Sequence, residues 1–150
     1  MADIKSKEAR SQNMAKIKSK DTKPEMWFRK QLFAKGFRYR KNVNYIFGHP
    51  DLWLAKYHTA IFIHGCFWHR HPNCKYAYLP KSRVGFWKEK FHKNRTRDEL
   101  VKNTLFDTNI RVLIVWECKV KQMQKDHDFA EDILSKISSF LKSDLSFLEI

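Results

Sequence analysis

Two short apolar segments constrain the fold of this chain most strongly. Residues 59–63 read TAIFI and residues 112–116 read VLIVW, with almost no polar residue in either segment. A strand with one face in water alternates apolar and polar residues, whereas a strand covered on both faces is apolar at successive positions. We therefore predict that residues 59–63 and 111–116 form central, buried strands of a sheet.

A helix is predicted ahead of these strands. Thr22 and Glu25 have the spacing of a capping box, and Pro24 stands in the first turn. The helix should end near Gly36. Its buried side is expected to carry four apolar residues, Trp27, Phe28, Leu32 and Phe33.

Further patterns complete the expected fold. Short strands are predicted over about residues 37–41 and 51–54, a charged helix over about 86–106, and an amphipathic helix through the apolar positions between 129 and 140. Residues 64–83 show no regular pattern and are expected to be irregular. The alternation of helices and apolar strands predicts an α/β domain of three layers with a central mixed sheet.

The chain carries a strong positive charge. Lys and Arg number 30 against 16 acidic residues, a formal net charge of +14, while 43% of the residues are hydrophobic. This composition is typical of a globular protein that binds a polyanion, and nucleic acid is the first candidate. No apolar run of about 18 residues is present, so no membrane partner is expected. We expect one domain over residues 1–150, with residues 1–20 as a basic arm that contacts DNA.

The cysteines and one histidine suggest a metal centre. The first residues lack the apolar segment of a secretory signal, so we expect a cytoplasmic protein whose cysteines stay reduced. Binding to DNA would place it at the bacterial nucleoid. Cys66, His71 and Cys74 lie within nine residues, and Cys118 follows the last core strand. Three thiolates and one imidazole form a common closed, structural zinc site. The alternative is that Cys118 is a buried thiol and the other two cysteines are free.

Asp51 is a candidate magnesium ligand. It follows Gly48, His49 and Pro50 at the start of a predicted strand. Mg²⁺ prefers oxygen ligands and keeps several waters, so one carboxylate, a backbone carbonyl and phosphate oxygens can suffice. The alternative is an aspartate that only initiates the strand, and the Pro-Asp pair by itself favours that interpretation.

No second nuclease carboxylate follows in the expected place. Glu117 and Lys119 resemble the Glu-x-Lys half of the restriction-nuclease signature, but that half normally lies on the strand next after the aspartate. The next strand here is residues 59–63, which carry no carboxylate. Glu117 and Lys119 are therefore interpreted as strand-end charges.

Histidines are candidates for acid–base chemistry near neutral pH. His64, His69, His71 and His49 lie close in the sequence, and His69 is the freest of the cluster if His71 binds zinc. Glu25 has a simpler explanation, because this position of a capping box selects glutamate for local hydrogen bonding.

Paired aromatic residues stand beside these groups. Phe67 and Trp68 lie within the Cys/His segment, and Phe86 and Trp87 open the following helix. In nucleic-acid-binding proteins such residues stack on bases or wedge between them. Packing around the zinc site is an equal alternative for Phe67 and Trp68, and packing is favoured for Phe86.

Together these segments resemble the Vsr endonucleases of very short patch repair. The resemblance keeps its order along the chain from residue 10 to about residue 118. The matching segments are RSQNM at 10–14, DTKPE at 21–25, GHPD at 48–51, IFIHGCFWH at 61–69 and VLIVWEC at 112–118.

The resemblance implies a restriction-endonuclease-like fold that lacks the second acid–lysine pair. It implies a Mg²⁺-dependent nick 5′ of the T in a T:G mismatch, which corrects deaminated 5-methylcytosine. Asp51 and the main-chain carbonyl of Ile63 would bind Mg²⁺. His69 would activate water, and Glu25 and His64 would organise water molecules around the cation.

The resemblance also implies ligands and partners. Cys66, His71, Cys74 and Cys118 would hold the structural Zn²⁺. The partner would be double-stranded DNA with a T:G mismatch, bound by a monomer, with mismatch-repair proteins as possible further partners. The expected DNA contacts are Phe67, Trp68 and Trp87 from the major groove, Met14 from the minor-groove side, and Arg10.

Two departures and two alternatives accompany the resemblance. Ile63 stands where family members can carry Thr. Pro72 and Asn73 differ from the corresponding loop of a family member, a difference that concerns the local loop and the DNA sequence preferred around the mismatch. One alternative is a Vsr-like nickase with another mismatch or sequence target. The other is a zinc-stabilised DNA-binding module, which would bind DNA tightly without cutting it.

Overall fold

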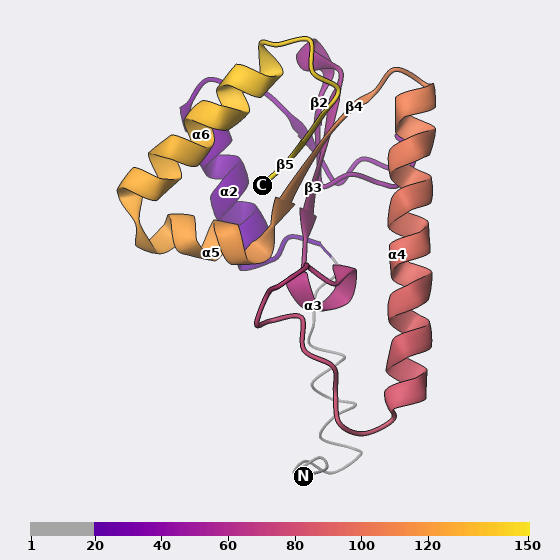
Figure 1. The fold of residues 1–150 in the computed structure, drawn as a ribbon. Helices are drawn as coiled ribbons and strands as arrows, with labels where there is room; N and C mark the ends of the chain where they lie inside the picture. The colour runs from indigo at the N-terminus through magenta and orange to yellow at the C-terminus, as the bar shows by residue number, and fades with distance from the viewer. Residues whose placement is uncertain (1–19) are drawn as a thin grey trace.

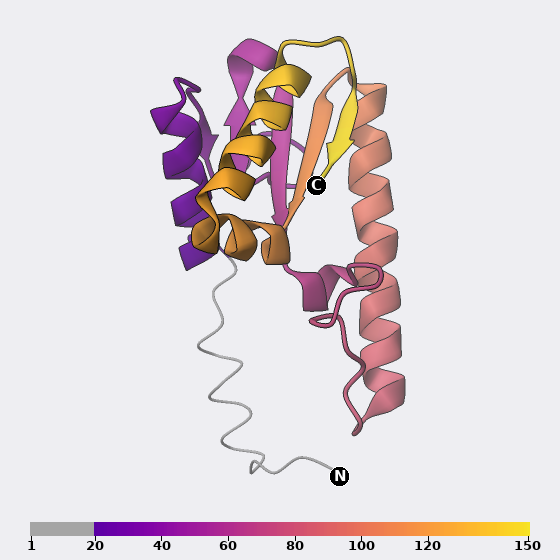
Figure 2. The same cartoon turned by 60° about the vertical axis from the view of Figure 1, so that its left-hand side comes forward.

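The computed structural model describes residues 20–150, which form a five-stranded mixed sheet with helices on both faces (Figures 1 and 2). The expected basic arm, with Arg10 and Met14, lies outside the described residues except for Lys20. In chain order the elements are α2 (Lys23–Ala34), β1 (Arg40–Lys41), β2 (Leu52–Leu54), η1 (Ala55–Tyr57), β3 (Thr59–His64), α3 (Cys66–His69), α4 (Val84–Asp107), β4 (Arg111–Trp116), α5 (Glu117–Lys125), α6 (His127–Leu141) and β5 (Phe147–Glu149).

The sheet is mixed, as predicted. Its strand order follows the sequence from β1 to β5. The pairs β1–β2 and β2–β3 are antiparallel, whereas β3–β4 and β4–β5 are parallel. The register places Ile63 beside Val115 and His64 beside Trp116, so β3 and β4 end at the same edge of the sheet.

Each central strand is covered on both faces, which confirms the prediction from the apolar runs. Ile61 of β3 and Leu113 of β4 belong to the core cluster that also contains residues of α2, α5 and α6. Ala60 and Phe62 of β3 belong to a second cluster with residues of α4. Figure 1 shows the resulting three layers, with α4 on one side of the sheet and α2, α5 and α6 on the other.

Helix α2 begins where the capping box predicts. The hydroxyl oxygen of Thr22 accepts a hydrogen bond from the backbone N–H of Glu25, at 3.3 Å. The helix ends at Ala34, just ahead of Gly36, whose φ of +94° suits glycine. Phe28 and Leu32 are fully buried, but the expectation that Phe33 is buried is wrong, because its side chain is 53% exposed.

Several elements differ from the sequence-based expectations. Residues 66–69 form the short helix α3 within the segment expected to be irregular, and only Arg40–Lys41 of the first expected strand pair with β2. Helix α5 directly follows β4, and β5 adds a fifth strand that was not predicted. None of the described helices combines the length and apolar character needed to span a bilayer.

Candidate active site and metal centre

The predicted catalytic residues converge at the edge of the sheet where β3 ends. A cavity of about 260 Å³ lies between this edge and α4. Among its lining residues are all four predicted catalytic side chains, from α2, the residue just before β2, the end of β3, and α3: Glu25, Asp51, His64 and His69. Helix α4 supplies the opposite wall with Asn94, Arg97, Asp98, Val101 and Lys102.

Asp51 is held in this cavity by the neighbouring strand. The backbone N–H of Ile63 donates a hydrogen bond to its Oδ2 atom, at 2.6 Å. Burial and, to a smaller extent, the negative charge of Glu25 raise the pKa of Asp51 to about 7, against the opposing effect of the Ile63 hydrogen bond. The carboxyl group of Glu25 is therefore close enough to disfavour the ionisation of Asp51.

Glu25 lacks full compensation for its burial. Its side chain is buried, and within residues 20–150 its Oε2 atom finds no hydrogen-bond partner. Burial raises the pKa of Glu25, although the backbone N–H groups of Asp21 and Thr22 lower it. A buried carboxylate oxygen without a partner, beside a second carboxylate, fits a hard divalent cation such as Mg²⁺.

The turn before Asp51 depends on Gly48. This glycine has a φ of +86°, and a Cβ atom there would overlap Cγ1 of Val101 on α4. His49, with a φ of +51°, follows in the left-handed region, and its N–H donates to the carbonyl of Ile46 at 3.0 Å. Close contact between this turn and α4 thus places Asp51 at the cavity.

The two histidines form a stacked pair. The imidazole rings of His64 and His69 lie 3.8 Å apart between centroids and are inclined by 5°. Burial and, to a smaller extent, the charge of His69 lower the pKa of His64 to about 3, so His64 is neutral at physiological pH. The Nδ1 atom of His69 lies 2.7 Å from Oδ2 of Asp98, which orients this ring from α4.

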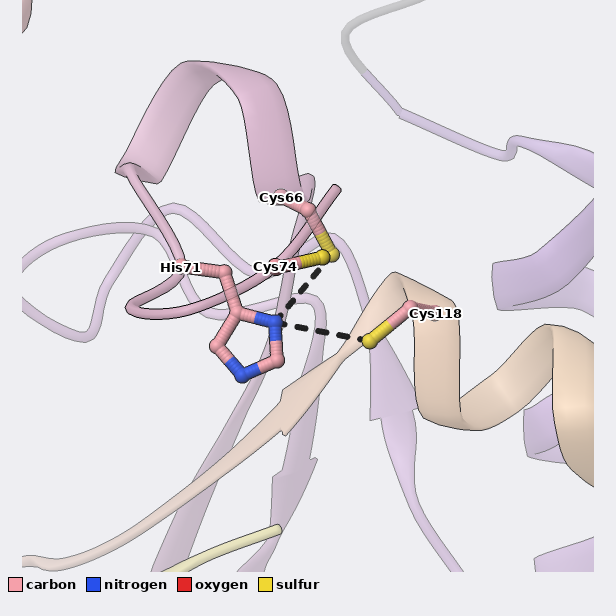
Figure 3. Close-up of side chains that lie close together, drawn as sticks. All are labelled: Cys66, His71, Cys74 and Cys118. Atoms are coloured by element: carbon pink, nitrogen blue, oxygen red, sulfur yellow. Dashed lines mark hydrogen bonds between the residues drawn. The ribbon is translucent and has the colours of Figure 1, made fainter. Parts of the chain in front are cut away.

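The four predicted zinc ligands also converge. Their ligand atoms all lie within 4.8 Å of one another, although Cys66 and Cys118 are 52 positions apart. Figure 3 shows the side chains of Cys66, His71, Cys74 and Cys118 pointing toward a common centre. The Nδ1 atom of His71 lies 3.6 Å from Sγ of Cys66 and 3.4 Å from Sγ of Cys118.

This donor set fits a closed zinc site. Three sulfurs and one imidazole are a common set for tetrahedral Zn²⁺. Burial raises the pKa of Cys66 to about 12, so a cation is needed to hold this sulfur as a thiolate at neutral pH. Cys66 begins α3 and Cys118 lies in the first turn of α5, so a bound ion would join the loop to the sheet edge.

The predicted DNA-contacting aromatics form one cluster. Phe67 lies 5.1 Å from Trp68 and 5.5 Å from Trp87, measured between ring centroids. Trp68 and Trp87 are 5.9 Å apart, and all three side chains remain partly exposed. Phe67 and Trp68 also line a second cavity of about 730 Å³, which shares Glu25, Ile63 and His69 with the first.

Helix α4 also positions the aromatic cluster and supplies positive charge. The side-chain amide of Asn94 donates to the carbonyl of Trp68 at 3.1 Å, which fixes α3 against α4. Arg97 and Lys102 line the same cavity as Asp51. Positive side chains beside paired carboxylates are suited to holding a phosphodiester.

The chain is similar in sequence to known DNA endonucleases. Residues 2–75 match the family described as DNA mismatch endonuclease Vsr. The Type II nicking enzyme V.NmeAIP of Neisseria meningitidis serogroup A is 49% identical over 121 residues, which are 81% of this chain and 86% of that protein. The DNA mismatch endonuclease Vsr of Escherichia coli K12 is 39% identical over 130 residues, 87% of this chain and 83% of that protein. This chain belongs to the Vsr family.

The protein is accordingly a DNA endonuclease, a hydrolase of phosphodiester bonds related to enzymes of DNA repair. Nicking enzymes recur among its relatives, since V.XorIIP of Xanthomonas oryzae pv. oryzae is also a Type II nicking enzyme, 37% identical over 82% of this chain and 90% of that protein. This Vsr-family chain is thus a Vsr-like DNA nickase.

Two residues of α4 that line this Vsr-family site, Asn94 and Asp98, were not predicted from the sequence. Asp98 and Asn94 are separated by one helical turn and face the cavity together. Because α4 carries many charged and polar residues, no sequence pattern distinguishes these two from the others. The pairing of Asp98 with His69 spans 29 positions of sequence and becomes visible only in the fold.

Proposed function

We propose that this Vsr-family endonuclease uses Mg²⁺ to nick one DNA strand 5′ of the T in a T:G mismatch. One observation carries the proposal, namely that the Glu25–Asp51 carboxylate pair and the His69–Asp98 pair share a single cavity. The first pair is suited to a hard cation, and the second is suited to moving a proton. Both are needed to hydrolyse a phosphodiester by metal-assisted attack of water.

Asp51 and the main-chain carbonyl of Ile63 would hold Mg²⁺, with Glu25 and the neutral His64 ordering waters around it. When bound, the cation supplies positive charge against the charge that develops on the phosphate oxygens. The raised pKa of Asp51 supports this assignment, because burial and Glu25 both disfavour a second uncompensated negative charge.

His69 would take the proton from the attacking water. Asp98 faces its Nδ1 atom, so Nε2 is the nitrogen that remains to accept a proton. Asp98 also stabilises the positive charge that His69 acquires. Arg97 and Lys102 would hold the phosphate in line with this base.

The Cys/His centre would bind Zn²⁺ in a structural role. A set of four protein ligands leaves no open position for substrate. The ion would instead fix the segment that carries Phe67, Trp68 and His69. Elemental analysis of the purified protein tests this assignment, with about one zinc per chain expected from four ligands.

The aromatic cluster would read the mismatch. Phe67, Trp68 and Trp87 are partly exposed beside the catalytic cavity, where they can enter the major groove. Met14 of the basic arm would contact DNA from the minor-groove side, and Arg10 would also contact the DNA. We propose that a monomer binds the duplex, with mismatch-repair proteins as further partners.

The alternative function is a nickase that acts on another mismatch or sequence, because several relatives are named Type II nicking enzymes. A panel of duplexes that differ only in one pair (T:G, T:A, G:G and A:C) separates these possibilities. We expect nicking of T:G only, and only with Mg²⁺. Preferential nicking of another pair would mean that the enzyme has a different target. Tight binding without any cutting would favour a non-catalytic DNA-binding module.

A further inference from the structure

A single side chain bridges the metal centre and the catalytic cavity. The indole of Trp116 stacks on the imidazole of His71, with ring centroids 4.2 Å apart and planes inclined by 9°. The same indole meets His64 edge-on, with centroids 5.2 Å apart. Trp116 is 6% exposed, so its ring is held between a proposed zinc ligand and a proposed catalytic residue.

The sheet brings Glu149 to this indole. Within the parallel ladders His64 pairs with Trp116, and Glu149 pairs with Ile114, two residues before Trp116. Side chains two apart share a face of a strand, so His64, Trp116 and Glu149 lie on the same face of three adjacent strands. Two backbone hydrogen bonds fix the register of β5 against β4. The N–H of Trp116 donates to the carbonyl of Ile150, and the N–H of Ile150 donates to the carbonyl of Ile114, both at 2.9 Å.

The indole has one polar atom, and Glu149 satisfies it. Nε1 of Trp116 donates a hydrogen bond to Oε2 of Glu149, at 2.9 Å. A hydrogen bond to a carboxylate is stronger than one between neutral groups, and an indole N–H buried without a partner is costly. Loss of this acceptor would therefore favour rotation of the Trp116 ring away from its stacked position.

We propose that Glu149 is a positioning residue for both centres, acting through Trp116 on His71 and His64. This inference rests on the proposed zinc centre and the proposed catalytic role of His64. It assigns a role to β5, an edge strand that carries none of the ligands or catalytic groups described above.

The test compares Glu149→Ala, which removes the acceptor, with Glu149→Gln, which keeps an acceptor and removes the charge. Glu131→Ala is the control, because Glu131 pairs with Lys35 at the C-cap of α2, outside the catalytic machinery. The first readout is the rate at which a chelator removes cobalt or zinc from the loaded protein. The second is the indole N–H resonance of Trp116, assigned by comparison with Trp116→Phe.

We expect Glu149→Ala to lower metal affinity about 10-fold, at the low end of the range for outer partners of metal ligands, and to release the metal correspondingly faster. Its Trp116 indole proton should shift and exchange faster with solvent. The turnover number for nicking should fall while DNA affinity stays unchanged. Glu149→Gln should restore most of each property, and Glu131→Ala should match the wild type.

A double-mutant cycle separates positioning from a general loss of stability. In the Trp116→Phe background there is no indole N–H, so Glu149→Ala should add no further effect on metal release. Additive effects, or wild-type metal release in Glu149→Ala, would overturn the inference while leaving the zinc centre in place. Wild-type protein that binds no metal would instead overturn the zinc proposal, and this inference with it.

Discussion

Nδ1 of His69 on α3 lies 2.7 Å from Oδ2 of Asp98 on α4, which fixes the orientation of the proposed general base. We expect His69→Ala to lower the turnover number by about 10²–10⁴-fold with little change in DNA affinity. Asp98→Asn should lower it by less, because the base remains but its orienting carboxylate is lost. Single-turnover nicking and equilibrium binding measure the two quantities separately.

The pairing itself is tested by combining the changes. If Asp98 acts through His69, Asp98→Asn should have almost no effect in the His69→Ala background. Equal losses of rate and affinity in His69→Ala would mean that His69 contacts DNA and is not the base.

The carboxylate pair predicts a specific dependence of stability on pH. Burial and Glu25 raise the pKa of Asp51 to about 7, from 3.8 for a free carboxyl group. The folded state therefore keeps a proton that the unfolded state has lost, so in magnesium-free buffer the free energy of unfolding should fall as pH rises from about 4 to 7. Asp51→Asn should weaken this dependence. Urea unfolding of zinc-loaded protein at several pH values measures it.

The same experiment with Mg²⁺ links the carboxylates to the cation. A ligand that binds only the folded state raises the free energy of unfolding. Mg²⁺ should therefore stabilise the wild type at pH 8 and leave Asp51→Asn unchanged. Equal stabilisation of both proteins would place the cation elsewhere.

Gly48 gives a prediction that is independent of any ion. Gly48→Ala introduces a Cβ atom that overlaps Val101, at a φ of +86° that disfavours alanine. We expect a loss of stability of about 1–3 kcal/mol and a fall in nicking, because the turn carries Asp51. Gly36→Ala is the matched control, since its φ is +94° but no atom lies within 4 Å of the added Cβ. Equal losses in the two variants would show that contact with α4 is unimportant.

Much of this architecture was predictable because it is encoded locally. Thr22 caps α2 through a hydrogen bond across three residues, and the apolar runs of β3 and β4 require cover on both faces whatever the helices are. The metal centre of three cysteines and one histidine was also predictable, because few roles other than metal binding bring together cysteines and a histidine at such spacing.

The remainder depends on contacts between distant segments. β5 has three residues, and its place in the sheet comes from hydrogen bonds to β4 and not from its own pattern. α5 is mostly polar, so its sequence pattern did not predict a helix there. Glu117, interpreted from the sequence as a strand-end charge, directly follows β4, begins this helix and pairs with Lys121. Glu149 and Asp98 acquire their partners only through the fold.

The aromatic cluster makes the mismatch preference testable. Replacing Phe67 and Trp68 with alanine removes two side chains that contact each other and Trp87 but supply no metal ligand. A wobble pair is easier to unstack than a matched pair, so a wedge favours mismatched DNA. We expect the double variant to lose most of its preference for T:G over T:A in competition binding while retaining zinc.

Phe33→Ala is the control for that experiment, because it removes an exposed aromatic ring from α2, outside the cluster. Its preference should equal that of the wild type. A double variant that keeps the full preference would show that Phe67 and Trp68 only pack the loop.

The position and metal dependence of the nick test the central proposal most directly. A duplex with one T:G pair, labelled at either end of either strand, is incubated with excess protein and Mg²⁺ beside its T:A counterpart. The proposed site predicts one cut, immediately 5′ of the mismatched T, in that strand alone. It also predicts no cut in the T:A duplex and none by Asp51→Asn. Cutting of both duplexes at equal rates, or wild-type nicking by Asp51→Asn, would contradict it.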